Sequence, residues 1–138
     1  ILLVKDKSNV TGGSDDKRWE IRPSSQKFYN FSKVSIPTDA KIKTVAVYVE
    51  HFEQERFPKE KLQWIIGTGW PGKPKVWVSM KAPLNEGEPY EATDLWDITS
   101  IVDTPEKVNS FQLLIKNDCS PGGRKTFIDY IYTIVEWQ

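Results

Sequence analysis

The stretch Thr126-Phe127-Ile128-Asp129-Tyr130-Ile131-Tyr132-Thr133-Ile134-Val135-Glu136-Trp137 decides the fold of this 138-residue chain. Nearly every residue in it is β-branched or aromatic, and it contains neither Gly nor Pro. Such residues favour extended backbone, so the stretch predicts one long strand. Both of its alternating sets of side chains are largely apolar. The strand therefore needs cover on both faces and is expected inside a sheet, because at an edge it would promote aggregation.

A second long strand is predicted at residues 41–52, where apolar side chains also occupy both alternating sets. One set is Ile42, Ala46, Tyr48 and Phe52, and the other is Val45, Val47, Val49 and His51. We expect this strand to lie beside the C-terminal strand in the interior of the sheet.

Shorter strands are predicted in the remaining chain, separated by Gly- and Pro-rich turns. They cover residues 1–4, 18–22, 27–34, 62–66, 76–80, 91–98 and 108–116. A single helical turn is expected at 100–103, capped by Thr99 or Ser100 and stopped before Pro105. The strand at 108–116 is expected to form a terminal hairpin with the strand at 126–137. Eight or nine strands at this spacing predict an all-β fold, an antiparallel β-sandwich of the jelly-roll kind.

Composition excludes several classes of partner. Lys plus Arg number 19 and Asp plus Glu number 19, so no excess of positive charge points to nucleic acid or an anionic membrane. No apolar run approaches the ~20 residues needed for membrane insertion. Cys119 is the only cysteine, which excludes an internal disulfide and a Cys-based zinc site. The length predicts a single domain over 1–138, and because the chain begins with Ile1 we expect a module of a larger protein.

Several short motifs together resemble a known group of domains. They are Trp96-Asp97-Ile98-Thr99-Ser100-Ile101-Val102, the following Asn109 to Ile115, the segment Ile36 to Ile42, and Ile128-Asp129-Tyr130-Ile131. Over residues 36–137 the chain resembles extracellular jelly-roll domains of the carbohydrate-binding-module and galactose-binding-like type. The resemblance implies a module of a secreted or cell-surface protein. The chain departs from it in having no tryptophan pair at the spacing of a sugar platform.

Groups that could support catalysis are few. His51, Glu53 and Glu55 share one side of a strand if its alternation continues, and such a row could bind a metal or act as a base. We expect instead a strand end that meets solvent. Cys119 lies in a loop with nothing nearby to lower the pKa of its thiol, so a Cys119–His51 pair is not expected to react. The sequence therefore predicts a protein that is not an enzyme.

Trp70 lies in a loop, residues 67–74, that contains three glycines and two prolines. An indole in such a loop is either held out for a partner or tucked beneath the loop as a plug. Sugar rings stack their C–H faces on aromatic planes, and their hydroxyl groups bind polar side chains. If the loops lie together, the predicted ligand-binding residues are Trp70, Lys73, Glu86, Glu88 and Tyr90.

Asp129 is a carboxylate in a strand that should be buried, where it interrupts the face of Phe127, Ile131 and Val135. In the jelly rolls that this chain resembles, a carboxylate in the last strand often helps to hold a structural calcium ion. The partners for calcium at Asp129 would be Asp6, Asp15, Asp16 or Glu20. The alternative is an ordinary hydrogen bond, or an ion pair with Arg18 or Arg22.

Two functions are consistent with these features. The first is a non-catalytic carbohydrate-binding or adhesive module of an extracellular protein, with a polysaccharide as its partner. The second is a structural domain of a cell-surface or surface-layer assembly, whose exposed aromatic side chains face neighbouring domains of the same protein.

Overall fold

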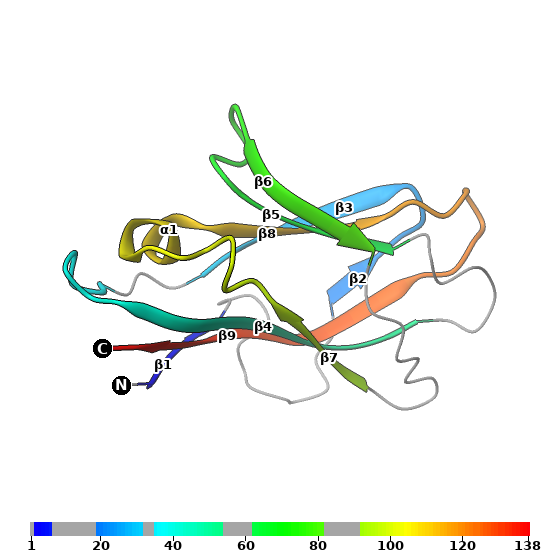
Figure 1. Ribbon diagram of the computed structural model, residues 1–138. Coiled ribbons are helices and arrows are strands. Elements are labelled where there is room, and N and C mark those ends of the chain that lie inside the picture. Colours follow the sequence, from blue (N-terminus) through cyan, green and yellow to red (C-terminus); the bar gives the residue numbers. More distant parts are fainter. Residues whose placement is uncertain (1, 7–18, 32–34, 54–61, 82–91) are drawn as a thin grey trace.

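The computed structural model describes residues 2–6, 19–31, 35–53, 62–81 and 92–138, and these form two facing antiparallel sheets (Figure 1). The strands are β1 (Leu2–Asp6), β2 (Trp19–Ile21), β3 (Ser25–Asn30), β4 (Ile42–Glu53), β5 (Leu62–Thr68), β6 (Lys75–Lys81), β7 (Ala92–Asp97), β8 (Gln112–Asn117) and β9 (Thr126–Trp137). One sheet has the order β1-β9-β4-β7, with β2 also pairing with β9, and the other has the order β3-β8-β5-β6. The described residues thus confirm the predicted antiparallel β-sandwich.

The two long strands lie where the sequence predicts them. β9 is flanked by β1 and β2 on one side and by β4 on the other, and β4 lies between β9 and β7. On β4, Val45, Val47 and Val49 are fully buried between the sheets. Inward and outward positions therefore alternate along β4 as its sequence predicts.

A β-bulge at Asp129 corrects the predicted faces of β9. Glu50 pairs with Tyr130 and His51 pairs with Ile128, so Asp129 is an extra residue without a cross-strand partner in the β4–β9 ladder. The bulge shifts the alternation by one position. Phe127 consequently lies on the outer face, stacked on Phe52, and does not share the inner face of the residues that follow the bulge.

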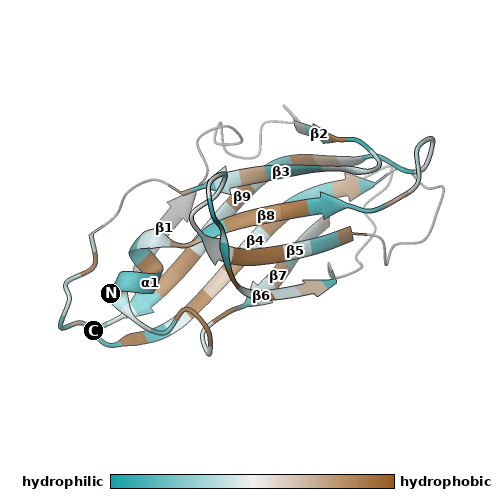
Figure 2. Cartoon of the chain, turned by 90° about the horizontal axis from the view of Figure 1, so that it is seen from above, coloured by the Kyte–Doolittle hydropathy of each residue, from teal (hydrophilic) through white to brown (hydrophobic). Residues whose placement is uncertain are grey.

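The core fills the space between the two sheets. Its fully buried members include Val45, Val47, Val49, Ile66, Leu113, Ile115, Ile131 and Val135. Seen from above, hydrophobic residues recur along β5 and β8, the two central strands of the second sheet (Figure 2). This burial is the main source of the fold's stability.

The helix of this chain lies after the helical turn predicted at 100–103. The carbonyl of Ile98 accepts hydrogen bonds from the N–H groups of Ile101 and Val102, which gives a single turn near the expected place. The helix α1 (Pro105–Ser110) follows, with Thr104 as its N-cap. Pro105 begins this helix and does not stop one, because the first helical turn needs no N–H from that position. None of the described residues belongs to a helix long and apolar enough to cross a membrane.

The predicted terminal hairpin is wrong. β8 pairs with β3 and β5 in one sheet, whereas β9 pairs with β1, β2 and β4 in the other. The connection between β8 and β9 crosses from sheet to sheet, and the Asn117 side chain holds it by donating to the carbonyl oxygens of Ile21 (3.3 Å) and Arg124 (2.9 Å). Each of the two strands buries one face in the core between the sheets. β8 and β9 therefore meet through that core and not through a shared ladder of hydrogen bonds.

Candidate functional site

An open hollow of about 460 Å³ lies where β5 ends, β6 begins and α1 crosses between the sheets. It is lined by Thr68, Lys75, Trp77, Thr104, Glu106, Lys107 and Ser110. The volume falls within the ~300–1,000 Å³ usual for small-molecule sites. We call this feature the Trp77 hollow.

A second β-bulge aims Trp77 at this hollow. Gly67 pairs with Val76 and Ile66 pairs with Val78, which leaves Trp77 as the extra residue of the edge strand β6. Bulges at sheet edges commonly redirect a side chain in this way. Trp77 is half-buried and packs against the core, while it also lines the hollow.

The opposite wall of the hollow is α1 and its cap. The Thr104 hydroxyl accepts a hydrogen bond from the N–H of Lys107 (3.2 Å), and buried Val108 anchors the helix. Lys107 Nζ lies 6.0 Å from the centroid of the Trp77 ring and 3.0 Å from Oδ1 of Asp103. The hydrogen bond from Lys107 holds the pKa of Asp103 below its ordinary value. The hollow thus presents an aromatic ring beside ammonium, carboxylate and hydroxyl groups.

Trp77 lies in the strand predicted at 76–80, but the sequence does not predict this site. One available signal was the pair of lysines, Lys75 and Lys81, that bound the strand. Lysines are typical of edge strands, where a tryptophan retains an accessible face. The helical wall is not predicted from the sequence, because the expected helical turn ends before Pro105 and the observed helix begins there.

Trp70 lies on the outer face of the second sheet and is 9% exposed. It packs on Ile65 and Leu114, with its ring centroid 6.0 Å from that of Phe28. Its backbone N–H donates to Oε1 of Gln112 (2.7 Å), and its carbonyl accepts from Nε2 of the same side chain (3.1 Å). The exposed ring on which the sugar-platform hypothesis rests is therefore not observed, and Trp70 occupies the position of a plug.

Gly67 is required for this arrangement. A Cβ atom there would collide with the carbonyl oxygen of Lys75 and would lie 2.9 Å from Cη2 of Trp70. Of the other predicted ligand-binding residues, Lys73 is exposed in the same loop and does not line the Trp77 hollow. Glu86, Glu88 and Tyr90 lie outside the described residues, so the ligand-binding role of this set stays a prediction.

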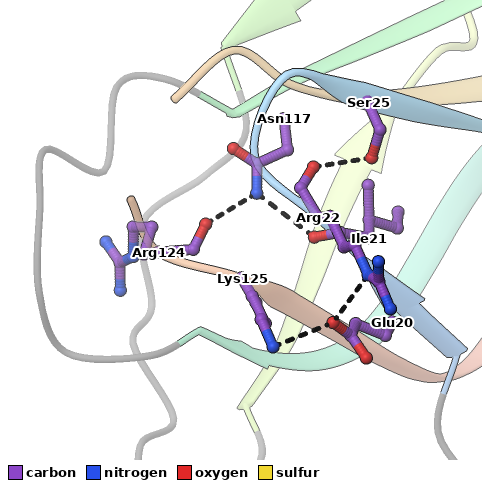
Figure 3. Close-up of polar contacts among 7 residues, drawn as sticks. All are labelled: Glu20, Ile21, Arg22, Ser25, Asn117, Arg124 and Lys125. Carbon is purple, nitrogen blue, oxygen red and sulfur yellow. Dashed lines mark hydrogen bonds and ion pairs between the residues drawn. The ribbon is translucent and has the colours of Figure 1, made fainter. Parts of the chain in front are cut away.

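The proposed calcium ligands are not gathered in the described part of the chain. Asp129 is fully buried at its bulge. Glu20 on β2 pairs with Phe127 on β9. Its Oε1 atom lies 3.2 Å from Lys125 Nζ and 3.4 Å from Arg22 Nε (Figure 3). The hydrogen bond from Lys125 is the main reason that the pKa of Glu20 is lowered.

No group of three His, Cys, Asp or Glu side chains that could hold a metal occurs among the described residues. The side chain of Asp6 and the whole of Asp15 and Asp16 lie outside what the structure describes. Calcium therefore stays a prediction.

His51 forms a buried triad with two carboxylates. The prediction that it lies at a strand end that meets solvent is therefore wrong. Its Nδ1 lies 2.5 Å from Oε1 of Glu53, and its Nε2 lies 2.7 Å from Oδ2 of Asp94 on β7. All three residues are at most 3% exposed, and the ring packs edge-on to Trp64. Burial alone would lower the pKa of His51, but hydrogen bonds and charges from Asp94 and Glu53 raise it from 6.5 to about 9.

This triad can be tested by its pH dependence. Because the pKa of His51 is raised on folding, its stabilisation is fully present below pH 6.5 and is lost as the pH rises through about 9. The loss amounts to roughly 3 kcal/mol, at about 1.4 kcal/mol per pKa unit. We expect urea unfolding to show this decrease between about pH 6 and about pH 9.5. His51 is the only histidine, so its NMR titration reports the pKa directly.

The matched variant for this prediction is Asp94→Asn, which keeps a hydrogen-bonding side chain but removes a charge. It should lower the pKa of His51 and move the alkaline loss of stability to lower pH. A titration midpoint near 6.5 in the folded parent protein would contradict the assignment.

Neither ring nitrogen of His51 faces Cys119. Both nitrogens bond to carboxylates, and Cys119 is buried in the β8–β9 connection. The carbonyl of Cys119 accepts a hydrogen bond from the hydroxyl of Ser24 (2.9 Å). The described residues thus do not bring the cysteine and the histidine together as a nucleophile and base.

Comparison with known proteins gives similarity only among solved structures. No protein-family model matches the chain, and no curated protein matches it. SGBP-B from a complex xyloglucan utilization locus in Bacteroides uniformis is similar with a TM-score of 0.48 and 13% identity over 84% of this chain and 38% of that one. The VP2 subviral particle of infectious bursal disease virus is similar with a TM-score of 0.49 and 10% identity over 98% of this chain and 32% of that one.

The Gt strain of the same virus has a TM-score of 0.44 and 11% identity, over 98% of this chain and 31% of that one. The chain thus spans only about a third of the length of these proteins. All three TM-scores lie below 0.5, and no function follows from these similarities.

Proposed function

We propose that this domain is a non-catalytic carbohydrate-binding module of an extracellular protein and that the Trp77 hollow is its ligand site. The observation that supports the proposal is a half-buried indole, directed by a β-bulge into an open hollow with a polar rim. An aromatic ring offers a flat apolar surface to the C–H face of a sugar. Lys75, Glu106 and the hydroxyl groups of Thr68 and Ser110 can exchange hydrogen bonds with sugar hydroxyls.

The geometry also suits binding without catalysis. Among the described residues that line the hollow, Glu106 is the one with a carboxyl group, whereas hydrolysis of a glycosidic bond commonly uses a pair of carboxyl groups flanking that bond. An open site at a sheet edge can accept a chain that continues beyond it in both directions. We therefore infer that a polysaccharide, held along the surface, is the partner.

The test is Trp77→Ala, measured by affinity electrophoresis against a panel of soluble plant, algal and animal polysaccharides. Retention on the polymer that binds the parent protein should weaken at least about tenfold, because truncation of an aromatic anchor typically costs ~2 kcal/mol or more. Trp77 also packs on the core, so the variant will lose stability as well.

Trp70→Ala is the matched control for that loss of stability. This variant also removes a tryptophan side chain, but one that lies on the outer face of the same sheet and does not line the hollow. It should be destabilised yet retain polysaccharide binding while folded. Retention that survives Trp77→Ala would reject the hollow as the ligand site.

A second function, a structural unit of a surface assembly, is favoured by one observation. Leu95, Tyr48 and Tyr132 form a cross-strand row on the outer face of the first sheet. Leu95 is 50% exposed, and the two tyrosine rings stack with centroids 4.7 Å apart. A neighbouring domain could cover this row. Glycan binding that is absent from the parent protein, together with self-association that Leu95→Asp abolishes, would favour this function.

A further inference from the structure

The charges that line the Trp77 hollow specify its ligand further. Among the described residues that line the hollow, two carry ammonium groups, Lys75 on β6 and Lys107 on α1, and one carries a carboxylate, Glu106. The chain as a whole has equal numbers of acidic and basic residues. The positive excess among these lining residues is therefore a local feature, although Asp103, which lies outside the lining, also pairs with Lys107.

Lys75 is exposed, and among the described residues no acidic side chain forms an ion pair with it. The segment 73–81 contains Lys73, Lys75 and Lys81 and no Asp or Glu. No acidic residue close to Lys75 in the sequence thus offsets its positive charge. An anionic ligand in the hollow would gain a charge-assisted hydrogen bond from it.

Lys107 has a carboxylate partner that a ligand can replace. Its ammonium group lies 3.0 Å from Asp103 Oδ1, and the two side chains are 41% and 52% exposed. Ion pairs this exposed are weak because water screens them and both side chains lose freedom in forming them. The same ammonium lies 6.0 Å from the Trp77 ring centroid, beside the surface on which a sugar would stack.

We propose that the Trp77 hollow binds an acidic polysaccharide, with the carboxylate of a uronic acid between Lys75 and Lys107 while its ring stacks on Trp77. This inference rests on the proposed function and names the ligand class of the same site. Glu106 is the unfavourable neighbour in this arrangement, since its negative charge lies on the wall that carries Lys107.

The experiment compares acidic and neutral forms of one polymer. Polygalacturonate, alginate and hyaluronan are each used with their methyl-esterified forms, which keep the sugar backbone and remove the negative charge. We expect at least one acidic form to bind about tenfold or more tightly than its ester, because hydrogen bonds to charged groups are the stronger kind. Raising the salt from about 20 mM to about 200 mM should weaken acid binding and leave ester binding unchanged.

The variants separate the contribution of each charge. Lys75→Gln and Lys107→Gln should each weaken acid binding about tenfold with little effect on the ester. Lys81→Gln is the matched control, since Lys81 is an exposed lysine on the same strand that does not line the hollow, and it should change binding less than about twofold. Glu106→Gln should tighten acid binding severalfold.

The outcomes distinguish failure of the acidic-ligand inference from failure of the proposed carbohydrate-binding function. Binding to neutral forms that needs Trp77 but is indifferent to both lysines would overturn the acidic ligand and leave the carbohydrate-binding function in place. Binding to dextran sulfate that is stronger and independent of Trp77 would show general attraction of charge and overturn the site. If the parent protein binds no glycan at all, both the acidic ligand and the carbohydrate-binding function are overturned.

Discussion

Replacing His51 with alanine is expected to lower the free energy of unfolding by about 3–5 kcal/mol, the range observed when one partner of a buried ion pair is removed. The imidazole bridges Glu53 and Asp94, which are 3% and 2% exposed. Without it, two carboxylates remain near each other in the core with their shared partner gone. The cost of burying two like charges without the imidazole between them is therefore added to that of the cavity.

Urea unfolding at neutral pH measures this effect, with Thr44→Ala as the control. Thr44 lies on the same strand but is exposed, and its truncation should change stability by no more than about 0.5 kcal/mol. The His51→Ala variant should also lack the decrease in stability that is expected for the parent protein between pH 6.5 and about 9. A variant as stable as the parent, with the same pH dependence, would show that the triad contributes nothing to the fold.

Replacing Trp70 with alanine is expected to cost about 3–5 kcal/mol, the usual range for a buried aromatic side chain truncated to alanine. The indole covers Ile65 and Leu114 on the outer face of the second sheet and contacts Phe28. Truncation would expose this small apolar cluster to water. It would also deprive the turn held by Gln112 of the packing that fixes its position.

Thermal and urea unfolding measure this cost, and Val76→Ala is the control because Val76 is 53% exposed near the same turn. Val76→Ala should be nearly neutral. The opposite result for Trp70→Ala, unchanged stability together with lost polysaccharide retention, would restore Trp70 as the sugar platform. The same pair of measurements therefore decides between the two tryptophans as ligand sites.

The bulge at Trp77 explains why the candidate site could be predicted only in part. In a regular strand, side chains alternate between the two faces, so Trp77 would point to the other face from Val76 and Val78. With regular pairing, Trp77 would therefore lie on the outer face of the sheet. The insertion of one residue opposite Ile66 and Gly67 changes that direction. Residue identity in β6 signals an edge strand, but the position of the bulge depends on the pairing of β6 with β5.

The elements that can be predicted from the sequence alone are those whose signal is local. The bounds of β9, the two faces of β4 and the assignment of both strands to a sheet interior follow from β-branched and aromatic residues recurring with period two. The sandwich follows from the number and spacing of such strands and the turns between them. These features need only interactions between residues close in the chain.

The places where distant segments meet are seen in the folded structure and not in the sequence pattern. Asp94 lies 43 residues from His51 in the sequence, and its strand must pair with β4 before the triad exists. β8 and β9 lie in opposite sheets although they are adjacent in the chain. The Trp77 hollow needs β5, β6 and α1 together. These arrangements are set by cross-strand register and by burial of a shared core, which period and composition do not encode.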